Sequence, residues 1–330
     1  MSLLIFSDND AVMRSLRVLN CSDAPVRLEK ALSLSLDMDC TDPDQKPCRL
    51  LTLDGMWVRE RHMNYRDIGY GFQGVSSNRG ETSHHEQPFL GLVSPSATQH
   101  QGEVYGFHLV YSGNFRGQVE RDSYDTIRVT LGINPDRFSF TLQPGESFQA
   151  PEGVMVYSCQ GLGGMTHTFH DLYRNHLIRG IWRDKKRPIL INNWEATYFD
   201  FDSDKLLDIA RAAQKAGIEM LVMDDGWFGK RDLDVSGLGD WFVNENKIKG
   251  GLKKLVDEVN ALGMKFGIWF EPEMISPDSD LYRAHPDWAI KIPGRTPTQL
   301  RNQYVLDLSR KEVRDTVYDM VAAVLRSANL

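Results

Sequence analysis

The sequence predicts a β-sandwich followed by an α/β domain, which forms an incomplete (β/α)8 TIM barrel with about three βα units. Three observations support this prediction. The 330 residues exceed the size at which one hydrophobic core usually stops growing, so we expect two domains. Short alternating segments fill residues 1–185, whereas apolar strands alternate with helical patterns over residues 186–330. We therefore assign a β-sandwich domain with a linking helix to 1–185 and the N-terminal part of a (β/α)8 barrel to 186–330.

Short segments rich in β-branched and aromatic residues predict the strands of the first domain. Four of them are 104–111, 126–133, 137–142 and 154–158. Turn sequences separate them, such as Asn134-Pro135-Asp136 and Gln143-Pro144-Gly145-Glu146. Many short strands at this spacing are typical of a β-sandwich. Residues 165–179 then have the pattern of an amphipathic helix, which we expect to lead out of the sandwich.

The second domain begins with an apolar run, residues 188–194, that ends in polar and aromatic side chains. A helix is expected over 204–216, because an Asp-Ser pair precedes it as a cap and Gly217 follows it. A second helix ends at Gly263, and its apolar face consists of Leu252, Leu255, Val256, Val259 and Leu262. A final helix is predicted to begin at a capping box, Ser309 with Glu312, and its inward residues are Val313, Val317, Val321 and Val324.

Carboxylates follow the second and third predicted strands. The apolar run 218–223 has the length of a strand buried on both faces, and Asp224 and Asp225 come directly after it. The run 264–270 also ends in carboxylates. In a parallel α/β domain the carboxyl ends of the strands hold the functional residues. The alternative is that one aspartate caps the following loop and the other is solvated.

Only three clear strands of the second domain are present, whereas a closed barrel of this type has eight. The edge of the third strand and the inner faces of the helices would then have no partner. The sequence is therefore interpreted as a fragment of a larger fold.

Composition excludes several classes of protein. The hydrophobic fraction of 41% and the charged fraction of 25% are those of an ordinary globular protein. No apolar run reaches membrane-spanning length, and the first residues lack the pattern of a signal peptide, so we expect no membrane partner. The net charge of -7, without a basic stripe, argues against a nucleic-acid partner. The sequence has neither a metal-ligand cluster nor a glycine-rich dinucleotide loop, so we expect no cofactor.

Four scattered cysteines bear on the cellular compartment: Cys21, Cys40, Cys48 and Cys159. The simplest interpretation is free thiols in a reducing compartment, which together with the missing signal peptide predicts a cytoplasmic protein. A disulfide between Cys40 and Cys48 is also compatible with their spacing.

Four ordered motifs in the second domain carry a resemblance to a known family. They are Asn-Asn-Trp-Glu-Ala-Thr-Tyr-Phe at 192–199, Met-Asp-Asp-Gly-Trp-Phe-Gly at 223–229, Phe-Gly-Ile-Trp-Phe-Glu-Pro-Glu-Met at 266–274 and Arg-Asn-Gln-Tyr-Val-Leu-Asp at 301–307. These motifs resemble those of the bacterial α-galactosidases of glycoside hydrolase family 36. Upstream, segments 111–115 and 143–148 resemble the N-terminal β-sandwich of that family.

The resemblance implies a retaining glycosidase that acts on terminal α-linked galactose, as in raffinose and melibiose, without a cofactor or metal. By motif, Asp224 and Asp225 would hydrogen-bond hydroxyls of the galactosyl ring. Trp194 and Trp269 would form apolar walls of the subsite, and Arg301 would donate to the sugar or hold a carboxylate. The resemblance further implies that the complete enzyme is a homo-oligomer.

The catalytic residues are not expected in this chain. Such enzymes cleave the bond with two carboxylates, a nucleophile and an acid/base. In the family, the nucleophile lies in a Lys-Trp-Asp-Met-Asn type motif at the end of the fourth barrel strand, and the acid/base aspartate lies on a later strand. This sequence has no such motif, so both residues are expected beyond Leu330.

Alternatives remain for the candidate site residues and for the function. Both tryptophans could be core residues, and Arg301 could lie on the surface. Three glutamates offer another catalytic pair, although loop-stabilising roles are preferred for them: Glu195, Glu271 and Glu273. A related α-N-acetylgalactosaminidase or galactosyltransferase could share the barrel. A non-catalytic galactoside-binding or structural fragment is the third possibility.

Overall fold

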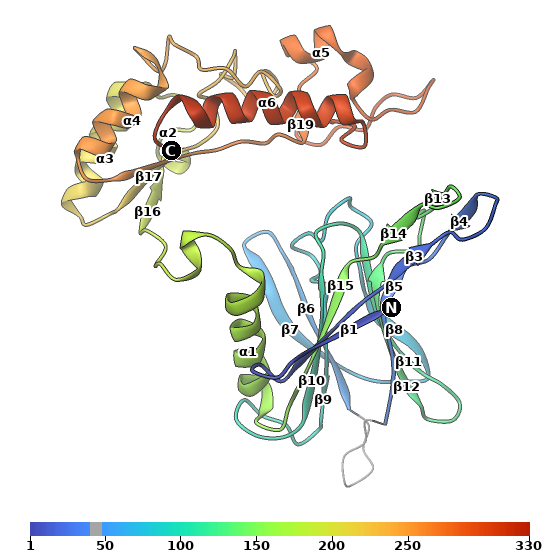
Figure 1. Ribbon diagram of the computed structural model, residues 1–330. Helices are drawn as coiled ribbons and strands as arrows, with labels where there is room; N and C mark the ends of the chain where they lie inside the picture. The colour runs from blue at the N-terminus through green and yellow to red at the C-terminus, as the bar shows by residue number, and fades with distance from the viewer. Residues whose placement is uncertain (40–47) are drawn as a thin grey trace. The chain divides into compact units, whose positions relative to one another are not determined.

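The computed structural model describes residues 1–39 and 48–330 (Figure 1). The chain divides into two compact units, Met1–Asp184 and Lys185–Leu330. No helix in the described part of the chain is both long and apolar enough to cross a membrane. Cys21 and Cys159 are free, exposed thiols, but Cys48 is disulfide-bonded, which corrects the expectation that all four cysteines are free thiols. Cys40 lies outside the described residues.

The first unit is a sandwich of two antiparallel sheets, as the sequence predicts. The larger sheet has the order β1 (Ser2–Phe6), β2 (Ala11–Ser15), β15 (Glu152–Ser158), β10 (Val104–Val110), β9 (Phe89–Val93), β6 (Arg49–Met56) and β7 (Arg59–Asp67). The smaller sheet has the order β5 (Leu32–Met38), β12 (Ile127–Ile133), β11 (Phe115–Arg121) and β8 (Gly71–Ser76). Two short ribbons complete the described strands of this unit, β4 (Val26–Leu28) with β13 (Phe140–Leu142) and β3 (Arg17–Leu19) with β14 (Ser147–Gln149).

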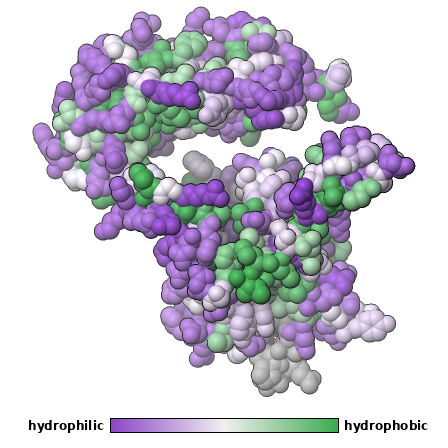
Figure 2. Space-filling view, viewed as in Figure 1, coloured by the Kyte–Doolittle hydropathy of each residue, from purple (hydrophilic) through white to green (hydrophobic). Residues whose placement is uncertain are grey.

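Alternating side chains of both sheets form the sandwich core. Leu50 and Phe107 from the larger sheet and Leu34, Phe115 and Val129 from the smaller one belong to one buried cluster. The period-two pattern of the sequence produces this arrangement, because successive side chains of a strand point to opposite faces. On the outside, Figure 2 shows a largely hydrophilic surface with a hydrophobic patch on the sandwich.

A helix covers part of the larger sheet, but it begins earlier than the sequence suggests. Helix α1 spans Gly161–Leu172 and continues into a π-helical turn, Tyr173–Leu177, whereas the sequence pattern predicts a helix over 165–179. Its first turn contains three glycines, and because glycine has poor helix propensity the sequence does not indicate that the helix begins there. Gly161 has φ of 70°, and a Cβ there would lie 2.3 Å from the carbonyl oxygen of Thr98. Only glycine therefore fits this close approach to the 98–102 loop.

His108 gives the sandwich a predictable pH dependence. Its Nδ1 lies 2.5 Å from the hydroxyl of Tyr173, and burial lowers the pKa of His108 to about 4. In the unfolded chain the pKa of histidine is about 6.5. As pH falls from about 6.5 toward about 4, the unfolded chain gains a proton that the folded imidazole does not, so stability is lost in this window. The loss attributable to His108 is expected to reach roughly 3 kcal/mol at pH 4.

Denaturant unfolding at pH 7 and pH 4 checks this expectation. The unfolding free energy of His108→Gln should fall less between the two pH values than that of the parent chain, by roughly 3 kcal/mol. His100→Gln, at an exposed histidine of the same unit, serves as the control and should match the parent. Equal pH dependence in parent and His108→Gln would contradict the assignment.

The second unit contains three parallel strands with helices, the first part of a barrel. The strands are β16 (Leu190–Asn192), β17 (Met220–Met223) and β18 (Lys265–Ile268), in that order in the sheet. The helices are α2 (Trp194–Thr197), α3 (Ser203–Lys215), α4 (Gly251–Ala261), α5 (Asp280–Ala284) and α6 (Lys311–Ser327). A 3-10 turn, Pro286–Trp288, and a short antiparallel pair, β19 (Met274–Ile275) with β20 (Tyr304–Val305), complete the unit. Within the described residues, β16 and β18 each pair with one strand and leave an open edge.

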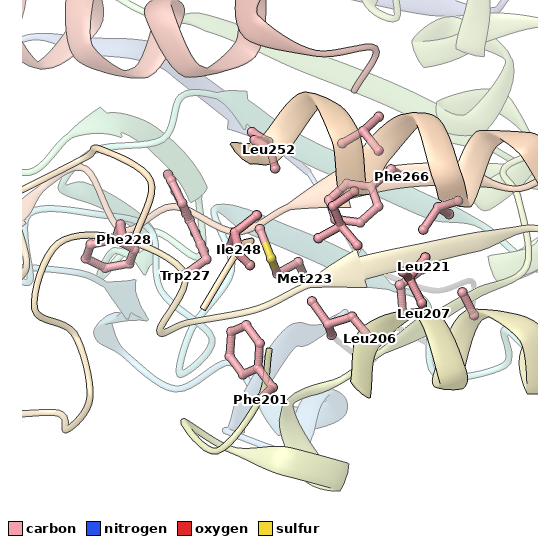
Figure 3. Packing of buried hydrophobic residues seen from close by; sticks show 14 of the residues in the cluster. Phe201, Leu206, Leu207, Leu221, Met223, Trp227, Phe228, Ile248, Leu252 and Phe266 are labelled. Atoms are coloured by element: carbon pink, nitrogen blue, oxygen red, sulfur yellow. The ribbon is translucent and has the colours of Figure 1, made fainter. Parts of the chain in front are cut away.

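The core of the second unit lies between its sheet and its helices. Figure 3 shows Leu206 and Leu207 of α3 near Leu221 and Met223 of β17. The predicted inner face of α4 is confirmed, with four of its residues buried and Leu262 partly buried. This packing fixes the strands, and therefore also the loops at their carboxyl ends.

Two local predictions in this unit need correction. The first strand ends at Asn192 rather than at Trp194, which instead begins the short helix α2. The expected capping box is absent at α6, whose N-cap is Arg310 without a side-chain cap. Ser309 instead donates its hydroxyl to Asp307, and Glu312 pairs with Arg310 at 2.8 Å. By contrast, Asp202 caps α3 as predicted, accepting from the Lys205 amide at 3.0 Å.

Candidate active site

The candidate site lies at the carboxyl ends of the three parallel strands. Asn192 is the last residue of β16, Asp224 follows β17, and Trp269 follows β18. Asn192 pairs in register with Val222, and Met223 pairs with Ile268, so the three ends lie along one edge of the sheet. Polar and aromatic groups from distant parts of the sequence therefore meet there, as the strand pattern predicts.

Asn192 connects Trp194 to Asp224. Its Nδ2 donates to Oδ2 of Asp224 at 2.5 Å, and its Oδ1 accepts from the Trp194 amide at 2.7 Å. The neighbouring Asn193 accepts from the Asp224 amide at 2.8 Å. Oδ1 of Asp224 in turn accepts from the Asp225 amide at 2.7 Å. This chain of hydrogen bonds fixes the first tryptophan and the paired aspartates relative to one another.

Asp225 is buried and ion-paired. It is only 2% exposed, and the side chain of Arg231 is fully buried beside it. Nε of Arg231 donates to Oδ1 at 2.9 Å and to Oδ2 at 3.2 Å, and Nη2 donates to Oδ2 at 2.8 Å. Such a two-point contact holds the carboxylate in one orientation. Asp224, by contrast, is only partly buried.

Trp269 and Trp194 are partly buried at the ends of their strands. The Trp269 amide donates to the Met223 carbonyl, and its own carbonyl accepts from Nε1 of Trp227, both at 2.9 Å. Its ring stacks on Phe228 with centroids 6.4 Å apart. The ring of Trp194 lies edge-on to Phe199 at 5.1 Å. Both side chains keep exposed surface, so neither is a fully buried core tryptophan.

Charged groups surround Glu271, which follows Phe270 in the third motif. Burial raises the pKa of Glu271, and the positive charge of Arg301 opposes that rise. The charges of Asp225 and Arg231 also act on its pKa. Arg301 is exposed, with φ of 52° in the left-handed region. Arg301 thus belongs to the same electrostatic cluster as Asp225, although no hydrogen bond between them is observed.

The other two glutamates considered as a catalytic pair are exposed. Glu195 accepts from the hydroxyl of Tyr198 at 3.2 Å, and this contact raises the pKa of that tyrosine. Glu273 accepts from the Leu306 amide through its backbone carbonyl at 2.9 Å. Among the described residues no group of three or more His, Cys, Asp or Glu side chains could hold a metal ion.

Sequence reasoning missed two kinds of residue at the candidate site. Asn192 and Asn193 stand in a quoted motif, but nothing in the sequence indicates that their side chains orient Asp224. Arg231 lies just beyond the motif 223–229 and is not among the predicted site residues. One signal could have found it, because a carboxylate after a buried strand needs a cationic partner if it stays ionised. Arg231 and Lys230 are the first cationic residues after the paired aspartates.

Two family models together match nearly the whole chain. Residues 147–330 match the family Melibiase, and residues 1–143 match the glycosyl hydrolase family 36 N-terminal domain. The α-galactosidase AgaA of Geobacillus stearothermophilus is 52% identical over 319 residues, which cover 97% of this chain and 43% of that protein. The Mel36A α-galactosidase of Lactobacillus acidophilus is 47% identical, covering 99% and 44% respectively.

Solved structures have the same fold over this length. A crystal structure of the Lactobacillus brevis α-galactosidase superposes with a TM-score of 0.96 at 44% identity, covering 99% of this chain and 44% of that one. A variant of Geobacillus AgaA in complex with stachyose superposes with a TM-score of 0.94 at 50% identity, covering 98% and 45%. The chain thus spans less than half the length of these relatives.

Proposed function

This chain belongs to glycosyl hydrolase family 36, the melibiase family, and on that premise we propose that it is the N-terminal part of a retaining α-galactosidase. We call the longer protein that this proposal implies, with catalytic residues beyond Leu330, the complete protein. Its reaction is the hydrolysis of terminal α-linked galactose from oligosaccharides such as raffinose, stachyose and melibiose. One observation carries the proposal, the convergence of Trp194, Asp224 and Trp269 at neighbouring strand ends.

The roles we propose follow from the chemistry of these side chains. Asp224 and Asp225 accept hydrogen bonds from galactosyl hydroxyls, and a carboxylate forms a stronger bond with a hydroxyl than a neutral acceptor does. Trp194 and Trp269 present apolar surface to the C–H groups of the sugar ring. Arg301 donates to the sugar or balances Glu271, whose pKa its charge affects.

The bond-cleaving carboxylates belong, in this proposal, to the part of the complete protein beyond Leu330. A retaining glycosidase needs a nucleophile and an acid/base whose oxygens reach the glycosidic bond. The oxygens of Asp225 are paired with Arg231, and those of Asp224 accept from Asn192 and from the Asp225 amide. Such fixed acceptors suit binding better than nucleophilic attack.

Three further features of the complete protein are proposed. We propose a homo-oligomer, by analogy with the family. We also propose a cytoplasmic location: the exposed free thiols of Cys21 and Cys159 support it, because such thiols persist in reducing compartments, whereas the disulfide at Cys48 opposes it. No cofactor is needed for this hydrolysis, since the two carboxylates supply the acid, base and nucleophile.

Hydrolysis of p-nitrophenyl α-galactoside and of raffinose by the complete protein tests this function. Release of p-nitrophenol and of galactose, with the α-anomer of galactose formed first, would support a retaining α-galactosidase. A folded complete protein that hydrolyses neither substrate would overturn the proposal. Activity on the N-acetylgalactosaminide alone would transfer the assignment to the related hydrolase.

Replacing Asn192 by alanine should impair binding without destroying the fold. The substitution removes the donor to Asp224 and the acceptor for the Trp194 amide, so both groups gain freedom. We expect kcat/KM for p-nitrophenyl α-galactoside to fall about 10- to 100-fold in the complete protein, at about 1.4 kcal/mol per tenfold. Asn246→Ala, at an exposed asparagine of the same unit, should leave it unchanged. Equal kinetics for Asn192→Ala and the parent would contradict the positioning of Asp224.

A further inference from the structure

We infer that Arg231 is a positioning residue for the glycosidase reaction, because it holds the carboxylate of Asp225 in the orientation that receives a sugar hydroxyl. This inference rests on the proposed function, in which Asp225 binds substrate. It assigns a specific task to a residue that itself has no exposed side-chain surface and therefore does not need to touch the sugar.

The hydrogen bonds leave Asp225 with one oxygen available. Oδ2 accepts from Nη2 at 2.8 Å and from Nε at 3.2 Å, whereas Oδ1 accepts only the shared Nε–H bond at 2.9 Å. An ionised carboxylate oxygen has about two acceptor positions. Oδ1 therefore retains an acceptor position for a hydroxyl, and Oδ2 does not. Without Arg231, rotation about the side-chain bonds of Asp225 would no longer be restricted to this orientation.

The surroundings of Arg231 fix its guanidinium in turn. Nη1 donates to the Ser236 carbonyl at 2.8 Å, and the guanidinium carbon lies 5.5 Å from the ring centre of Phe199. Gly237 presses against the arginine, since a Cβ at this glycine would lie 3.1 Å from the Arg231 Cβ. Nζ of Lys247 donates to the carbonyls of Phe199 and Gly226. These bonds connect the two backbone segments that lie beside Arg231.

A purely structural role is the competing explanation, and burial alone does not decide between the two. Desolvation offsets much of the Coulombic attraction in a buried ion pair, so such a pair adds little net stability to the fold. Loss of one partner, however, leaves a buried unpaired charge and destabilises the fold. The two explanations differ in coupling: a residue that acts through Asp225 has no effect on catalysis once Asp225 is gone.

Lysine is the informative replacement. It keeps the positive charge, but its single ammonium cannot hold both carboxylate oxygens in the planar two-point geometry of a guanidinium. We expect Arg231→Lys to fold and to lower kcat/KM for p-nitrophenyl α-galactoside by about 10- to 100-fold in the complete protein. Arg211→Lys is the matched control, because Arg211 is exposed on α3 and pairs there with the exposed Asp208. Its kcat/KM should be unchanged.

A double-mutant cycle tests the inference. We would measure kcat and KM for the complete protein and for Asp225→Ala, Arg231→Lys and the combined variant. The inference predicts that the combined variant has kcat/KM within about threefold of Asp225→Ala alone. Multiplied losses would overturn it while leaving the proposed function intact. Parent-like kinetics of Asp225→Ala would instead overturn both, so the two failures are distinguishable.

A second pair of variants covers the case in which Arg231→Lys does not fold. Asp225→Asn with Arg231→Gln replaces the ion pair by two uncharged side chains that can still form hydrogen bonds. Its kcat/KM should lie within about threefold of Asp225→Asn alone. A further loss of more than tenfold would overturn the inference, because Arg231 would then contribute independently of the carboxylate.

Discussion

Asp225→Ala in the complete protein is expected to lower kcat/KM for α-galactosides by two to four orders of magnitude, at about 1.4 kcal/mol per tenfold. The substitution removes a charge-assisted acceptor for a sugar hydroxyl. It also leaves the guanidinium of Arg231, whose side chain is fully buried, without the carboxylate that it contacts at 2.8 Å. We therefore expect a loss of stability of about 3–5 kcal/mol beside the kinetic effect.

Two measurements separate these effects. Kinetics with p-nitrophenyl α-galactoside well below the melting temperature report on binding and catalysis, and thermal unfolding of the same samples reports on stability. Asp208→Ala is a suitable control, since Asp208 is an exposed aspartate of the same unit that pairs with Arg211. It should match the parent in both measurements. An Asp225→Ala variant with unchanged kinetics would contradict a role for Asp225 in binding sugar.

The class of the fold was predictable because burial leaves a periodic trace in the sequence. The sandwich follows from alternating segments such as 126–133, in which Val129 and Leu131 are buried against the facing sheet. The α/β unit follows from the apolar face of α4 and from the apolar strand before Asp224, which is not buried on both faces as expected, since Leu221 and Met223 are buried and Met220 and Val222 are partly buried. In both cases the side-chain period of the element is visible without knowledge of its partners.

Local boundaries were less predictable, because distant segments decide them. Helix α1 begins among glycines because the amide of Gly161 donates to the carbonyl of Gly102, which lies far earlier in the sequence. The capping box at α6 is absent because Asp307 accepts from both the amide and the hydroxyl of Ser309. Neither competing contact has a signature in the local sequence.

The location of the site was predictable from the sequence, but the hydrogen bonds within the site were not. Strand-end position identified Asp224 and Asp225 as candidates, yet the two aspartates have different surroundings. Asp224 accepts a hydrogen bond from the side-chain amide of Asn192, and Asp225 accepts hydrogen bonds from the guanidinium of Arg231. This difference depends on the loop between β17 and α4, whose conformation requires glycines with positive φ, among them Gly226 and Gly237. Sequence alone gives the residues of such a loop but not the direction of their side chains.

The second large effect concerns the chain by itself. We expect no catalysed hydrolysis from residues 1–330, because both carboxylates that cleave the bond are proposed to lie beyond Leu330. Removal of either one costs a glycosidase its covalent step or its proton transfer, so the loss should be essentially complete. The open edges of β16 and β18 make a well-behaved sample harder to obtain, and its secondary structure must be checked in parallel.

Release of p-nitrophenol from p-nitrophenyl α-galactoside is the measurement that tests the central claim most directly. It is made on the purified chain, its Asp225→Ala variant and the complete protein. The account predicts turnover by the complete protein and no turnover above the uncatalysed rate by either form of the folded chain. Turnover by the chain that disappears in Asp225→Ala would contradict it, and would assign the catalytic pair to carboxylates within these residues, with Asp224, Asp225, Glu271 and Glu273 as the candidates.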